Sequence, residues 1–176
     1  MANQRYLKLA AENFQSIKKQ ADRAMEQLDI EELHCAPNAE SNSIAVLVKH
    51  MSGNLKSRFS DFLTSDGEKP DRNRDGEFNG TYASKTLLLD AWNSGWEVLF
   101  NTLAGLKEED LTKTVFIRSE AHSVMEAIQR QIVHQSSHSG QIVYIAKMIK
   151  DEEWTTLSIP RGKSETFNQQ MNKQFK

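Results

Sequence analysis

Cysteine, proline and long apolar runs are all scarce in this chain, and each scarcity excludes a class of protein. The one cysteine, Cys35, cannot form an internal disulfide, so we expect a protein of the reducing cytoplasm. No apolar run approaches the ~18 residues that a membrane-spanning helix needs, and the first residues lack the apolar core of a signal peptide. The three prolines, Pro37, Pro70 and Pro160, fall between periodic segments, as expected when the segments themselves are helices.

An excess of one charge is also missing. The 176-residue chain has 22 basic and 24 acidic residues, which are intermixed along the sequence and give a net charge of −2. This pattern predicts neither a nucleic-acid interface nor a polybasic membrane anchor. A chain of this length can bury a substantial core, and we expect residues 1–176 to form a single domain.

Apolar residues instead recur at three- and four-residue spacing, which predicts four long helices at about 4–28, 44–63, 84–106 and 124–150. A capping box, Ser123 to Glu126, opens the last of them. The pattern predicts a loop at 31–43 and a short amphipathic piece, Ser164 to Met171, in the tail. We therefore predict the all-α class and an antiparallel four-helix bundle.

Two stretches depart from the helical pattern. Residues 65–83 are polar and rich in turn residues, and their length predicts an ordered excursion over the bundle surface. Thr114 to Ile117 is the one plausible strand, as half of a short hairpin. Arg58 falls inside the apolar arc of the second helix, so we expect it to have a carboxylate partner or to extend to solvent.

Three short motifs resemble functional sites, but each lacks a feature that the site requires. The run from Asp71 to Gly76 begins like a calcium-binding loop, but its twelfth position is Tyr82 rather than a carboxylate. Residues 162–164 resemble the end of a phosphate-binding loop without its earlier glycine. Cys35 and His34 are adjacent on a loop, where side chains rarely meet as nucleophile and base.

The histidines of the long helices form the strongest pattern. His134 and His138 are four residues apart and share an apolar helix face, so both imidazoles should point inward and need a partner. His50 lies at the edge of the apolar stripe of the second helix. Neutral imidazoles suit zinc, nickel, iron(II) or copper, and three of them leave a coordination position open. Satisfied core histidines remain the alternative, because the four-residue spacing also arises by chance.

Beyond this spacing, the sequence around the histidines resembles the DinB/YfiT-like superfamily of bacterial metalloenzymes. The matching residues are Lys49-His50 followed by Gly53-Asn54, and the segment 134–142, which reads H-x-x-x-H-x-G-Q-I. Segments 57–64, 66–70 and 158–162 resemble one branch of that superfamily. The resemblance implies an up-down-down-up four-helix bundle, often a homodimer, with a divalent metal on His50, His134 and His138. Zinc or nickel is preferred over iron or manganese.

Superfamily members with known chemistry include transferases that use bacillithiol, mycothiol or glutathione, and a maleylpyruvate isomerase. The resemblance thus implies a metal-dependent transferase that joins a low-molecular-weight thiol to an electrophilic small molecule, with the metal favouring the thiolate. The candidate lining of its pocket is Ser43, Asn54, Gln131 and Gln141.

Two other functions stay open, a non-catalytic metal-binding or stress-related interaction protein and a metal-dependent hydrolase. No Asp or Glu stands out as a general base, which favours thiol chemistry over hydrolysis. A cavity that opens onto the metal would favour an enzyme, whereas a fourth protein ligand would favour a structural site.

Overall fold

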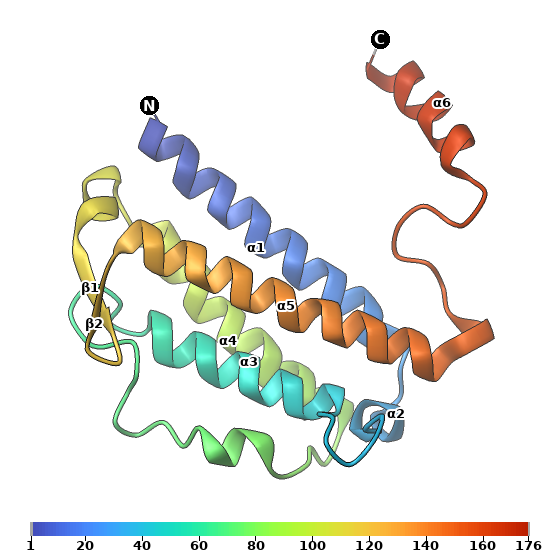
Figure 1. Ribbon diagram of the computed structural model, residues 1–176, viewed down its shortest axis with the longest axis horizontal. Coiled ribbons are helices and arrows are strands. Elements are labelled where there is room, and N and C mark those ends of the chain that lie inside the picture. The colour runs from blue at the N-terminus through green and yellow to red at the C-terminus, as the bar shows by residue number, and fades with distance from the viewer. Residues whose placement is uncertain (1, 176) are drawn as a thin grey trace.

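The computed structural model describes residues 2–175 and folds them into helices with one small sheet (Figure 1). Over these residues the α-helices are α1 (Ala2–Glu26), α2 (Ile30–His34), α3 (Ile44–Phe59), α4 (Lys85–Gly105), α5 (Val124–Lys150) and α6 (Ser164–Phe175). The strands are β1 (Thr114–Ile117) and β2 (Glu120–Ser123). Short 3₁₀ helices are η1 (Asp75–Phe78), η2 (Glu108–Thr112) and η3 (Asp151–Glu153). The predictions of a mostly helical chain and of one short hairpin are confirmed.

The four long helices α1, α3, α4 and α5 lie alongside one another (Figure 1), with α3 packed mainly on α4 and α1 mainly on α5. Large aromatic side chains fill the space between them. Phe14 is fully buried and meets Phe59 and Trp96 edge-on, with ring centroids 6.4 and 6.3 Å apart. Trp92 and Trp96 are buried as well and belong to the core.

Serine side chains fix where three of these helices begin. Ser43 accepts a hydrogen bond from the Val46 amide at the start of α3, and Ser84 plays the same part for α4. Ser123 and Glu126 form the predicted capping box of α5, in which each side chain accepts from the other residue's amide. These caps satisfy amide groups that have no partner within the helix and so set the register of the helices that carry the histidines.

Two predicted boundaries are wrong. The second long helix ends at Phe59 rather than at 63, because the chain turns at Asp61, where φ is 48°. Phe62 still packs into the core beyond that turn. The predicted loop at 31–43 begins inside α2, a single helical turn capped by Asp29 that buries Leu33. Five residues are too few to produce a detectable helical period.

The segment between α3 and α4 is ordered, as predicted, and follows the side of α3 (Figure 1). The β1–β2 hairpin fastens one end of this segment. Asp66 accepts hydrogen bonds from the amides of Arg118 and Ser119, at 2.9 and 2.7 Å, in the tight turn between the strands. The Gly67 amide donates to the Phe116 carbonyl at 2.8 Å. These bonds hold the segment against the body of the protein near the histidines.

At the other end of the chain, α6 stands away from the four long helices (Figure 1), and its side chains are exposed wherever they are described. None of the helices in residues 2–175 combines the length and the apolar character needed to cross a membrane.

Candidate metal centre

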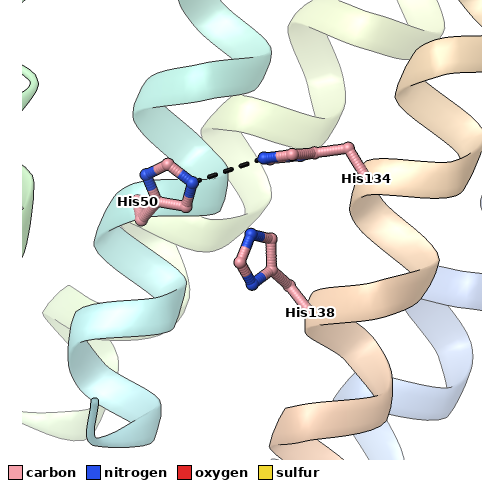
Figure 2. A group of neighbouring side chains, drawn as sticks. All are labelled: His50, His134 and His138. Atoms are coloured by element: carbon pink, nitrogen blue, oxygen red, sulfur yellow. Dashed lines mark hydrogen bonds between the residues drawn. The ribbon is translucent and has the colours of Figure 1, made fainter. Parts of the chain in front are cut away.

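Three histidines from two helices meet at one point (Figure 2), His50 from α3 and His134 and His138 from α5. One ring nitrogen of each lies within 4.8 Å of the other two. The Nε2 atoms of His50 and His134 are 3.4 Å apart. Two nitrogens bound to one tetrahedral zinc ion would be separated by about 3.3 Å, given metal–nitrogen distances of about 2.05 Å. This separation therefore fits a shared metal.

The orientation of His50 is fixed by a carboxylate behind it. Its Nδ1 atom lies 2.9 Å from Oε2 of Glu77, and both side chains are buried. An ionised carboxylate can only accept a hydrogen bond, so the proton of His50 is on Nδ1. The Nε2 lone pair then faces the other two histidines. Metal-binding histidines are usually oriented by an outer hydrogen-bond acceptor, and a carboxylate is one of the common ones.

Glu77 is in turn held by Arg72. The guanidinium donates from Nε to Oε1 at 2.7 Å and from Nη2 to Oε2 at 2.8 Å, which is a two-point pairing. Burial alone would raise the pKa of Glu77, but the hydrogen bonds from His50 and Arg72 and the charge of Arg72 outweigh it and hold that pKa below its ordinary value. Glu77 is therefore ionised at neutral pH.

The two histidines of α5 are half-buried and have weaker support. His138 donates from Nδ1 to the amide oxygen of Gln141 at 2.8 Å, so its Nε2 atom is also left without a proton. For His134, the only contact at Nδ1 among the described residues is a long one, 3.5 Å, with Nε2 of Gln135. Of the residues that the structure describes, no carboxylate lies behind either ring as Glu77 does behind His50.

The electrostatic surroundings favour neutral imidazoles on α5. Burial and, to a smaller extent, the nearby His138, His50, Arg58 and Arg72 together lower the pKa of His134 to about 3. Burial also lowers the pKa of His138, although its bond to Gln141 opposes this. Neutral imidazole is the form that binds a metal.

This donor set fits a divalent transition metal. Three imidazole nitrogens with outer oxygen partners suit zinc, nickel, iron(II) or copper better than magnesium or calcium, which prefer oxygen. Among the described residues, no fourth His, Cys, Asp or Glu joins the group. The histidines could therefore hold one metal ion with at least one position left for a non-protein ligand.

A cavity of about 280 Å³ opens beside the three histidines. Amide and guanidinium groups make up most of the rest of its wall. Its lining residues are His50, His134, His138, Asn54, Gln131, Phe78, Arg58, Arg72, Arg74, Arg118 and Arg130.

Of the four residues proposed from sequence to line the pocket, two line this cavity and two do not. Asn54 and Gln131 are buried and line this cavity. Gln141 lies behind His138 and holds its Nδ1 atom, and it lines a different surface cavity. Ser43 is not in the lining of the histidine cavity, and its hydroxyl is used by the cap of α3.

Sequence reasoning missed Glu77 and Arg72, which lie in the aperiodic 65–83 segment. Their only sequence signal was the predicted course of that segment over the helices. The predicted carboxylate partner of Arg58 is confirmed, since its Nη2 atom pairs with Oε2 of Glu68 at 3.0 Å. Burial lowers the pKa of Arg58, while Glu68 acts to raise it.

The arrangement of the helices is found in a solved structure. The crystal structure of the conserved protein of locus from Enterococcus faecalis superposes with a TM-score of 0.68 and covers 81% of this chain and 95% of that one. The two sequences are 19% identical, so the likeness concerns the fold.

The family assignment comes from the sequence. Residues 1–163 match the family described as "Protein of unknown function (DUF1572)", and the chain belongs to this family. A search of curated proteins found no significant match.

Proposed function

We propose that this protein is a metal-dependent enzyme of the DinB/YfiT-like type, with one divalent ion on His50, His134 and His138. The observation that carries the proposal is the convergence of the three imidazoles, two of which have Nδ1 tied to an oxygen acceptor behind the ring. This arrangement directs unprotonated nitrogen atoms at a common point. A divalent metal ion bound at that point would be held by three imidazole nitrogens.

The cavity supports a catalytic role over a structural one. Structural zinc sites are closed by four protein ligands, whereas catalytic sites keep a position for water or substrate. Here three ligands are present among the described residues, and the cavity is lined by all three. A small molecule that enters the cavity would thus reach the open coordination side.

Within this class we propose a transferase that uses a low-molecular-weight thiol on an electrophilic substrate. When bound, a divalent ion stabilises a thiolate and so supplies the nucleophile at neutral pH. Among the described residues, the lining of the cavity contains no carboxylate that could act as a base, and Glu77 is already bound by His50 and Arg72. The buried amides of Asn54 and Gln131 are placed to orient the reactants.

The same proposal extends to the setting of the enzyme. We propose a four-helix-bundle homodimer in the cytoplasm, with zinc or nickel as the preferred metal. The exposed apolar side chains of Tyr144 and Val133 on α5, 71% and 63% accessible, support an association surface on that helix. A monomeric mass in light scattering at micromolar concentration would contradict the dimer.

The test of the thiol reaction is spectroscopic. Protein loaded with cobalt(II) is titrated with dithiothreitol and with glutathione. We expect a sulfur-to-cobalt charge-transfer band that saturates at one thiol per cobalt. His134→Ala should abolish the band, whereas His122→Ala, a histidine outside the site, should leave it unchanged.

The outcomes separate the candidate reactions. Thiol-dependent turnover of a generic electrophile should require the metal and be absent in His134→Ala. If thiols leave the cobalt spectrum unchanged while acetate or phosphate alters it, the transferase proposal is wrong. The site would then be an oxygen-ligand centre of the hydrolytic or purely binding kind.

A further inference from the structure

Five arginine side chains line the cavity above the histidines, and no acidic side chain of the described residues lines it. They come from α3, from the segment between α3 and α4, from the hairpin and from α5. The five are Arg58, Arg72, Arg74, Arg118 and Arg130. The whole chain has a net charge of −2, so this concentration of positive charge is local. A cavity lined by one sign of charge attracts ligands of the opposite sign.

Two of the five arginines have a structural explanation. Arg58 is 7% accessible and donates to the Gly67 carbonyl as well as to Glu68. Arg72 is buried and holds Glu77 at two points. Each of these guanidiniums has specific partners that fix it in place, so together they form a rigid part of the wall.

Internal pairing does not explain the other three. The side chains of Arg118 and Arg130 are each more than half exposed, and among the described residues each forms one ion pair, at 3.1 Å to Glu68 and at 3.4 Å to Glu120. Exposed pairs of this kind contribute little to stability. Arg74 is exposed and lies over the Phe78 ring, 5.3 Å from its centroid. Stability of the fold therefore gives no reason for three such side chains to border one cavity.

The balance of charge around the cavity also favours an anionic ligand. In the part of the chain that the structure describes, the carboxylates that contact these arginines are those of Glu68, Glu77 and Glu120, and Glu68 alone pairs with three of the five. Five guanidiniums against three carboxylates leave two positive charges at the cavity, and a divalent ion on neutral histidines would add two more. An anionic ligand would offset this charge. The volume of about 280 Å³ suits a small molecule.

We propose that the small molecule bound in this cavity carries an oxyanion group, a carboxylate or a phosphate, that is held by Arg74, Arg118 and Arg130. Guanidinium forks match both groups with paired hydrogen bonds. The inference rests on the proposed function, because it names the substrate class of the same site. With the anion at these arginines, the rest of the ligand extends over the histidines and beside Phe78, which stacks on His50 with centroids 5.0 Å apart.

Calorimetric titration of the zinc-loaded protein with inorganic phosphate, succinate and neutral succinamide tests the inference. The variant replaces Arg74, Arg118 and Arg130 with Gln, and these exposed positions leave the core untouched. We expect binding of phosphate or succinate to weaken about tenfold or more in this variant, with unchanged zinc content. Comparing phosphate with succinate identifies the preferred oxyanion, and succinamide should bind weakly or not at all.

A matched control removes the same charge elsewhere. Replacing Arg5, Arg161 and Lys163 with Gln alters three exposed cations that do not line the cavity, and anion binding should stay as in the wild type. Equal binding by the cavity variant and the wild type, equal binding of succinamide and succinate, or no binding of either anion would each overturn the inference. Failure of the metal proposal looks different: the protein would bind no zinc, while anion binding would still depend on the three arginines.

Discussion

The two sides of the histidine site are built differently. On α3, His50 is 5% accessible and is backed by an ionised carboxylate that a buried arginine holds at two points. On α5, His134 and His138 are half-buried, and the support is a single amide oxygen behind His138. The first side is rigid and charged, and the second is neutral and more open. In a metal-loaded site, the α3 side would hold its ligand nitrogen the more firmly of the two.

The largest difference between the two sides should appear when the hydrogen-bond partner behind each histidine is replaced. Glu77→Gln takes the negative charge from behind His50 and leaves Arg72 without its ion pair, so metal affinity should fall about 10- to 100-fold. Gln141→Ala removes only a neutral acceptor from an exposed position and should cost less than about tenfold. Competition with a chromogenic chelator measures both. Equal losses in the two variants would contradict the difference between the sides.

The metal-free protein should lose stability as the pH falls, and His134 on the α5 side should contribute. Its pKa is about 3 in the folded chain against an ordinary value of 6.5, so below pH 6.5 the unfolded chain binds a proton that the folded chain does not. The free energy of unfolding should therefore decrease from pH 7 towards pH 5. Urea denaturation should show a shallower pH dependence for His134→Gln than for wild type. His122→Gln is the control, and identical slopes in all three would refute this assignment.

The smallest effect should come from two helical glycines, one on each side. A Cβ at Gly53 of α3 would press on the Glu77 carboxyl group, with its Cδ atom at 3.0 Å, and Glu77 cannot retreat without losing its bonds to His50 and Arg72. Gly53→Ala should thus weaken both metal binding and stability. A Cβ at Gly140 of α5 meets nothing within 4 Å, so Gly140→Ala should add about 0.5–1 kcal/mol of stability. Thermal and urea unfolding compare the two variants, and a stabilised Gly53→Ala with normal metal affinity would count against the close packing.

The parts of this site that helical periodicity governs could be predicted from sequence. The four-residue spacing of His134 and His138 placed both on one face, and the apolar stripe of the second helix placed His50 at its edge. The capping box at Ser123 likewise gave the start of α5. The helical repeat turns sequence distance into direction, so it predicted that the two histidines of α5 share one face. Their convergence with His50 was one of two interpretations that the spacing left open.

The outer residues could not be found this way, because a loop has no repeat. Glu77 and Arg72 reach the site only through turns of the segment after α3, beginning with the positive φ of Asp61. Which of the many polar side chains of that segment turns inward depends on contacts such as those of Asp66 with the hairpin. Ser43 shows that periodicity alone can also mislead. It lies two turns before His50, as periodicity predicts, but its hydroxyl caps α3.

The metal content of the purified protein tests the central claim most directly. Protein produced without a histidine tag should contain one divalent transition-metal ion per chain by elemental analysis. His138→Ala and the triple replacement of His50, His134 and His138 by Ala should contain almost none while keeping the helical circular dichroism, and the His122→Ala control should match wild type. A triple variant that retains the full metal content, or a wild-type protein that takes up no zinc, nickel, iron(II) or copper when these are supplied, would contradict the account.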